Sequence, residues 1–197
     1  MSGNNGFDFP EFWEYPPYYT VQPVAETFHK QKELWCGLIL RYCKHTRTFI
    51  IDVHDEDLAL FRNKKIDRTY IVLCACIVLA QLICGLDVGH LDRGEKRVFL
   101  DALVEDGKAI WVDKKDTCLI LWKSVDEWAD SVYSWCKNMA ESVILVDDLC
   151  GHDGEMQGSD ISGLPMALVV PVIACLEKSG RAKKFKSKTG EAGLKIF

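Results

Sequence analysis

The chain has 197 residues, a formal net charge of −5, 48% hydrophobic residues and 27% charged residues. That length is enough for one medium or two small cores, and the composition excludes a disordered or collagen-like chain. The acidic balance argues against a protein whose main task is to coat nucleic-acid phosphates. The start of the chain is polar and lacks the pattern of a secretory signal, and nine cysteines without a regular framework predict reduced thiols in the cytosol.

The segment Phe12–Pro23, FWEYPPYYTVQP, is rich in aromatic residues and prolines. Prolines favour an extended backbone that loses little entropy on docking, and the aromatic side chains favour pockets over water. Pro16, Pro17, Tyr18 and Tyr19 fit the PPxY pattern that WW domains bind, although this short pattern has many false positives. Two interpretations stay open: the segment folds back onto its own domain, or it anchors a partner protein.

The chain repeats itself at fixed offsets. Residues from Trp35 to Val53 recur 93 positions later, and residues from Leu103 to Val112 recur 73 positions later. The LILW stretch at 119–122 matches the final LKIF at an offset of 75. We therefore predict two copies of one unit. The first copy holds about 20 residues, between Asp55 and Leu103, that the second lacks.

Each copy has the pattern of a helix, a strand, a short helix, a helix and a β-hairpin. Apolar residues from Leu34 to Tyr42 have helical spacing, and a β-branched run follows at 49–53. In the second copy, the capping box at 124–127 begins a helix, and residues 143–146 form the strand. This order of elements is that of a winged helix.

We predict an α+β fold with an extended N-terminal segment at 1–26 and two tandem winged helices at 27–123 and 124–197. Pro171 lies inside the expected helix at 164–177. A proline inside a helix costs about 3 kcal/mol, so we expect a break or bend before it.

An uncharged run of 18 residues, Thr69–Leu86, occupies the extra part of the first copy, about 69–90. Three interpretations compete: a membrane span, a core element, or a segment foreign to the fold, such as a retained intron or an error in the gene model. A membrane span would carry part of one winged helix into the bilayer, and a core element would overfill a unit whose repeat lacks it. We favour the foreign segment.

The sequence predicts no catalytic, cofactor-binding or metal site. His54 lies near Asp52 and Asp55 without partners at ligand spacing, which is typical of surface residues after a strand. Glycines at 89–94 before Lys96 resemble a phosphate loop only weakly, because the lysine is one place late and no Ser or Thr follows.

Winged helices often bind DNA through the helix before the wing, so a transcription regulator is the alternative function. That helix is acidic in the first copy and apolar in the second, which disfavours contact with phosphates. We therefore expect no nucleic acid as a partner. The one opposing signal is the basic cluster of Arg181, Lys183, Lys184, Lys186 and Lys188.

Several stretches together resemble one family. They are PPYYTVQP at 16–23, Trp35-Cys36, FLDALVEDGKAIWVDK at 99–114 with CLILW after it, Trp128 and the closing GLKIF. In this order they resemble the vacuolar protein-sorting-associated protein 25 family, small winged-helix subunits of the second endosomal sorting complex. Family members run from an FxNxxI stretch, here Phe61–Ile66, directly into the third helix, which Leu91–Glu95 opens here.

The resemblance implies a non-enzymatic adaptor in a Y-shaped complex that contains two copies of this subunit. Pro16, Pro17, Tyr18 and Tyr19 would dock each copy onto one of two larger winged-helix subunits. The second winged helix would bind the first filament-forming subunit of the downstream complex three. The implied function is the sorting of ubiquitinated cargo into multivesicular bodies by a cytoplasmic protein at the endosome surface, with membrane contact only through the complex.

Overall fold

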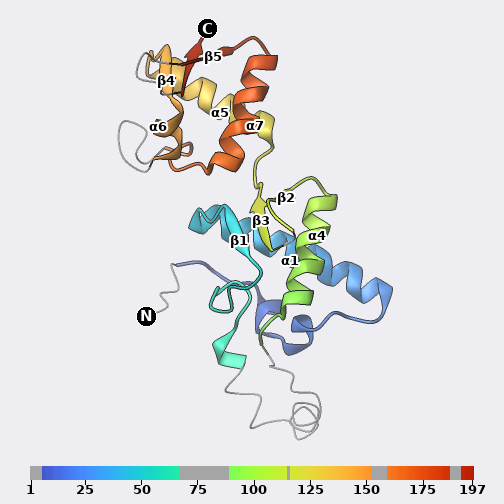
Figure 1. Cartoon of the computed structure of the whole chain (residues 1–197). Helices are drawn as coiled ribbons and strands as arrows, with labels where there is room; N and C mark the ends of the chain where they lie inside the picture. Colours follow the sequence, from blue (N-terminus) through green and yellow to red (C-terminus); the bar gives the residue numbers. More distant parts are fainter. Residues whose placement is uncertain (1–5, 67–88, 115, 152–158, 187–191) are drawn as a thin grey trace, which may run out of the picture. The chain divides into compact units, whose positions relative to one another are not determined.

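A computed structural model describes residues 6–66, 89–114, 116–151, 159–186 and 192–197. The chain divides into two compact units, Met1–Trp122 and Lys123–Phe197, and each combines helices with a three-stranded sheet (Figure 1). The prediction of an α+β fold with two tandem domains is confirmed.

In the first unit, an antiparallel sheet with the strand order β1-β3-β2 packs with two long helices. Helix α1 buries one stripe, which includes Trp35, Leu38 and Ile39, and ends where Arg47 takes a left-handed conformation with φ of 56°. The elements in chain order are η1 (Glu11–Glu14), η2 (Pro16–Tyr19), α1 (Ala25–Thr46), β1 (Ile50–Asp52), α4 (Arg93–Glu105), β2 (Ala109–Trp111) and β3 (Thr117–Ile120).

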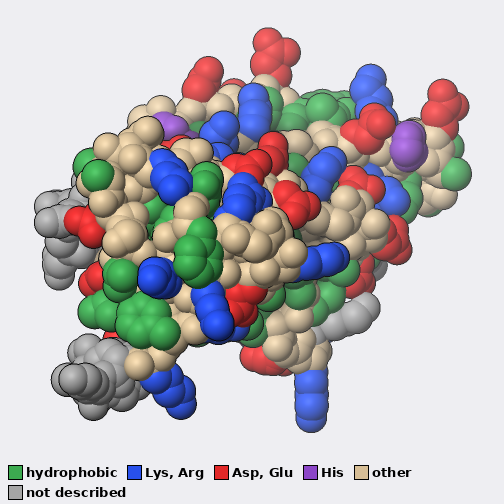
Figure 2. Space-filling model, turned by 90° about the horizontal axis from the view of Figure 1, so that it is seen from above, with side chains coloured by type: hydrophobic (Ala, Val, Ile, Leu, Met, Phe, Trp, Pro, Cys, Tyr) green, Lys and Arg blue, Asp and Glu red, His purple; other side chains and the backbone are tan. Residues whose placement is uncertain are grey.

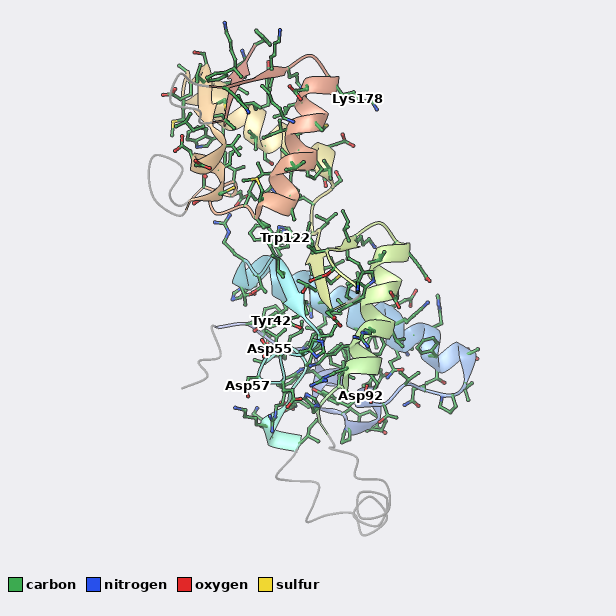
Figure 3. The ribbon with its side chains drawn as sticks, in the orientation of Figure 1. Tyr42, Asp55, Asp57, Asp92, Trp122 and Lys178 are labelled. Carbon is green, nitrogen blue, oxygen red and sulfur yellow. The ribbon has the colours of Figure 1, made fainter. Side chains whose placement is uncertain are left out.

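Helix α4 begins where the sequence places it. Asp92 is its N-cap, and a capping box joins the side chains of Asp92 and Glu95 to each other's backbone N–H groups, at 2.7 and 2.9 Å. Figure 3 shows Asp92 at the start of this helix. One face of α4 is apolar, and its Phe99 ring stacks on Trp35 with the centroids 5.6 Å apart.

The second unit repeats the plan with the sheet order β4-β6-β5. Ser124 and Glu127 form the predicted capping box of its first helix. The elements are α5 (Val125–Asn138), β4 (Val143–Leu145), α6 (Val146–Cys150), α7 (Met166–Lys178), β5 (Ala182–Lys186) and β6 (Ala192–Ile196).

Matching backbone hydrogen bonds confirm the internal repeat. The amide of Lys108 donates to Leu103 at 2.8 Å, and 73 positions later the amide of Arg181 donates to Leu176 at 3.0 Å. At the offset of 93, Arg47 is matched by Ala140, whose φ of 58° is also left-handed.

The last strand of each unit shows that the offset of 75 predicted for the final stretch of the repeat is wrong. Ile120 donates to Phe49, and Ile196 donates to Ser142, which makes the offset there 76 rather than 75. The sequence match of LILW with LKIF was misleading because a shift of one residue reverses which side chains face the core.

Helix α7 continues through Pro171, so of the predicted break or bend the break is wrong. Pro171 cannot donate to the carbonyl of Ala167, one turn earlier. The helix starts two residues later than expected, with Pro165 as its N-cap, and buried side chains hold it on both sides of the proline. Those side chains are Leu168, Val169, Val172, Ile173 and Leu176.

The uncharged run at 69–86 lies outside the described residues. Its flanks, however, meet. The backbone N–H of Asn63 donates to the carbonyl of Gly89 at 2.8 Å, and the backbone N–H of Leu91 donates to the carbonyl of Phe61 at 3.1 Å. Gly89 has φ of +99°, and a Cβ there would lie 3.0 Å from the Cβ of Ile66, so the chain leaves and returns at nearly one point.

None of the helices that the structure describes is long and apolar enough to cross a membrane.

Because these flanks are bonded to each other, we expect the first unit to fold without residues 67–88. A variant that joins Ile66 to Gly89 through two glycines should keep its free energy of unfolding within about 1 kcal/mol, since a shorter loop costs less entropy to close. Urea unfolding followed by tryptophan fluorescence measures this. A Gly/Ser linker of the original length is the control for composition. Loss of cooperative unfolding in both variants would show that the segment belongs to the core.

Candidate functional site

The aromatic N-terminal segment packs on the first unit as two 3-10 turns, η1 and η2, instead of a fully extended strand. Trp13 is 8% exposed, and its indole N–H donates to the carbonyl of Leu60 at 3.0 Å. The backbone carbonyl of Trp13 accepts hydrogen bonds from the hydroxyl of Tyr19 at 2.8 Å and from the side-chain NH2 group of Asn63 at 3.0 Å. These bonds fix η1 to the loop that follows β1.

Two side chains of α1 hold the PPYY turn from the other side. Gln31 is fully buried, and its amide group donates to the carbonyls of Tyr18 and Thr20, both at 2.9 Å. Its oxygen accepts from the backbone N–H of Gln22 at 3.1 Å. The buried indole of Trp35, one turn later, donates to the same Tyr18 carbonyl at 2.9 Å. We call Gln31 and Trp35 the segment clamp.

The clamp divides the four predicted docking residues into two pairs. Pro16 and Tyr19 are buried in the chain's own unit, and Tyr19 is only 2% exposed. Burial raises the pKa of the Tyr19 phenol, so its hydroxyl stays a neutral donor. Pro17 is exposed and Tyr18 is partly exposed, next to the ring of Tyr15, which is 54% exposed. The accessible surface of the segment includes Tyr15, Pro17 and Tyr18.

The two interpretations of the segment are therefore compatible with each other. The structure shows the segment folded back on its own domain through Trp13, Pro16 and Tyr19. Partner docking stays a prediction, now limited to the side chains that remain accessible. Sequence reasoning missed Gln31 and Asn63, both buried polar residues. The signal for Gln31 was a polar side chain one helical turn before Trp35, on the apolar stripe of α1.

The weak catalytic candidates are placed by the structure at surface or structural positions. His54 contacts Asp116 at 3.2 Å instead of the side chain of Asp55, and Arg97 bonds the same carboxylate at 2.6 Å. The Arg97 guanidinium holds the pKa of Asp116 below its ordinary value. Lys96 is fully buried and donates to the backbone carbonyls of Val53 and Asp55, so it supports the end of β1 and does not face a phosphate.

Two cysteines of the first unit lie in surroundings that keep their thiols uncharged. Burial raises the pKa of Cys36 to about 11 and that of Cys118 to about 12, which leaves both thiols protonated near pH 7. Among the residues that the structure describes, no group of His, Cys, Asp and Glu has the arrangement of a metal site.

The helices before the two wings are poorly suited to DNA. Glu95 of α4 caps its own helix, and Arg97 is tied to Asp116. Helix α7 buries one apolar face, and the side chains that it exposes include the apolar ones of Met166 and Val170. On the face that Figure 2 shows, acidic and basic side chains are mixed, so it does not present the uniformly positive surface that nucleic acid attracts.

Two units of helices and a three-stranded sheet, with an aromatic segment clamped on the first, define a tandem winged-helix chain. The family model of the ESCRT-II complex subunit matches residues 12–85 and 89–165. The chain belongs to this family. It is therefore a non-catalytic structural subunit of ESCRT-II, and the transcription regulator is not supported.

Individual relatives agree along almost the whole chain. Vacuolar protein sorting-associated protein 25 of Arabidopsis thaliana is 34% identical over 188 residues, which cover 94% of this chain and 92% of that protein. The protein with the same name from Danio rerio is 29% identical over 195 residues, which cover 97% and 99%.

Solved structures share the fold. The crystal structure of subunit VPS25 of the endosomal trafficking complex ESCRT-II superimposes with a TM-score of 0.72 at 21% identity, covering 95% of this chain and 98% of that one. A chain in the crystal structure of ESCRT-II with VPS22, VPS25 and VPS36 gives a TM-score of 0.70 at 20% identity, with the same coverage.

The segment clamp can be tested through Gln31→Leu. This change keeps the volume but removes three hydrogen bonds and leaves the backbone N–H of Gln22 without its acceptor, so we expect the free energy of unfolding to fall by about 2 kcal/mol. The amide of Gln22 should exchange with deuterium faster. Gln22→Ala is the matched control, because the Gln22 side chain bonds the same segment from an exposed position, and it should cost less than about 0.5 kcal/mol. Equal effects of the two changes would contradict the clamp.

Proposed function

We propose that this chain is an adaptor for sorting ubiquitinated cargo into multivesicular bodies. Its N-terminal segment docks onto larger winged-helix subunits of ESCRT-II, and its second unit binds the first filament-forming subunit of complex three. The single observation that carries the docking proposal is the clamp of Gln31 and Trp35, which holds the PPYY turn with Pro17 and Tyr18 outward. The solved complex with VPS22 and VPS36 supports partners of this class.

A segment that is already ordered loses little conformational entropy when a partner binds it. Both faces of η2 contribute to this order: Tyr19 is bonded to Trp13 on one side, and the Tyr18 carbonyl is bonded to α1 on the other. Tyr15 and Tyr18 then offer rigid rings with hydroxyl groups, which are typical of binding hot spots. Pro16 and Tyr19 act as positioning residues, since they are already buried in their own unit.

The place of action follows from the same proposal. As part of an endosomal sorting complex, the chain works on the cytoplasmic side of the endosome membrane and is recruited there by the complex. Two copies per complex would give two docking segments and two second units. The second unit would then link the complex to the filament-forming subunit without any catalytic step.

Docking is tested by recovery of the larger subunits on the immobilised full chain. The double change Pro17→Ala and Tyr18→Ala should lower the affinity by about 30-fold, because truncating a buried aromatic hot spot costs about 2 kcal/mol. Val24→Ala is the matched control: Val24 is 59% exposed and follows the segment. Tyr19→Phe should have a smaller effect, through looser positioning. Undiminished recovery by the double variant would refute docking through this surface.

Binding to complex three is tested by chemical cross-linking of assembled ESCRT-II with the filament-forming subunit. Lysine cross-links should map to the second unit, for example to Lys137 and Lys178, and not to Lys30 or Lys44 of α1. All four lysines are exposed, which makes the two sets comparable. Cross-links concentrated in the first unit would overturn this assignment and leave the docking proposal intact.

A further inference from the structure

The outer face of the second sheet combines basic and aromatic side chains. Strands β5 and β6 pair antiparallel with Lys183 opposite Lys195 and Phe185 opposite Gly193, and β4 places Val143 opposite Lys195. Because side chains alternate along a strand, these residues share one face, while Leu194 and Ile196 fill the core. The basic–aromatic face consists of Arg181, Lys183, Phe185, Val143, Lys195 and Phe197.

The charges on this face are largely uncompensated. Lys183 and Lys195 lie directly opposite each other, an arrangement that costs stability, and neither forms a salt bridge with any residue that the structure describes. Arg181 is bound by Asp130, and Lys184, on the other side of the sheet, is bound by Glu177. From Lys178 to Phe197 the sequence holds seven basic residues and one acidic residue.

Apolar groups lie between these cations and are exposed. Val143 is 44% exposed, Phe185 36% and Phe197 54%. The Phe185 ring lies across Gly193, where a Cβ would come within 2.4 Å of the ring. The Lys195 ammonium is 5.9 Å from the centroid of the Phe197 ring. The sheet therefore presents cations beside apolar groups.

The first unit shows that the fold does not require these lysines. In its sheet, Ile50 pairs with Leu119, which pairs with Ile110. That row corresponds in register to Val143, Lys195 and Lys183 of the second unit. The same scaffold thus folds with an uncharged row, so the lysine pair of the second sheet is not needed for packing.

We propose that the basic–aromatic face docks on the surface of an anionic lipid bilayer. The lysine ammonium groups match lipid phosphates and carboxylates, and their alkyl chains with the two phenylalanine rings match the boundary between headgroups and acyl chains. Nucleic acid would satisfy the cations but leave Val143 and Phe197 in water. This inference goes beyond the proposed adaptor function and needs no partner subunit.

The test is co-sedimentation of the full chain with vesicles of phosphatidylcholine that contain about 30% phosphatidylserine. We expect binding that weakens with added salt and that is lost on vesicles of phosphatidylcholine alone. Lys183→Ser with Lys195→Ser should weaken binding about 30-fold, since each basic residue near an anionic surface contributes about 1 kcal/mol. Phe185→Ala should weaken it further at high salt, where the apolar contact dominates.

The matched control is Lys30→Ser with Lys64→Ser, which removes two exposed charges from the first unit. Circular dichroism and thermal unfolding establish that each variant is folded before it is compared. Absence of binding by the unaltered chain, or an equal loss in the control pair, would overturn the proposal. So would tighter salt-dependent binding to a short DNA duplex than to the vesicles, which would assign the face to nucleic acid.

Discussion

The burial of one tryptophan organises the first unit. Trp35 is fully buried at the centre of α1, where its ring stacks on Phe99 and meets Tyr19 edge-on with the centroids 5.5 Å apart. Its indole N–H still needs an acceptor, because an unpaired donor costs about 1–3 kcal/mol when buried. The acceptor is the carbonyl of Tyr18. A core that closed without the N-terminal segment would therefore bear this cost, and this couples the proposed docking surface to the stability of the unit.

The sequence was sufficient for the features that depend on local pattern. The capping box at Ser124 marked the start of α5, and the repeat revealed two units. It was insufficient where contacts between distant residues decide. In Pro16–Tyr19 the two end residues are buried and the two middle ones stay accessible, an arrangement held by Gln31, which no local pattern connects to the segment. Helix α7 survives Pro171 because tertiary burial outweighs one lost hydrogen bond.

The two units show how one scaffold takes on different surface chemistry. Equivalent turns keep the left-handed backbone conformation, at Arg47 and at Ala140, although the residue types differ. The outer rows of the two sheets differ: Ile50, Leu119 and Ile110 make an apolar row in which Leu119 is buried, whereas the row of Val143, Lys195 and Lys183 carries two exposed lysines. The two units thus keep equivalent backbone hydrogen bonds while the side chains on the outer faces of their sheets differ.

The meeting of Asn63 and Gly89 has a practical consequence. Two backbone positions that are bonded across a departure point tolerate chain of almost any length between them, because loop-closure entropy grows only with the logarithm of length. This position is therefore a suitable insertion site for a fluorescent domain or an affinity tag inside the chain. A label inserted there would leave the clamped N-terminal segment and the C-terminal strand untouched, which tags at either terminus would not.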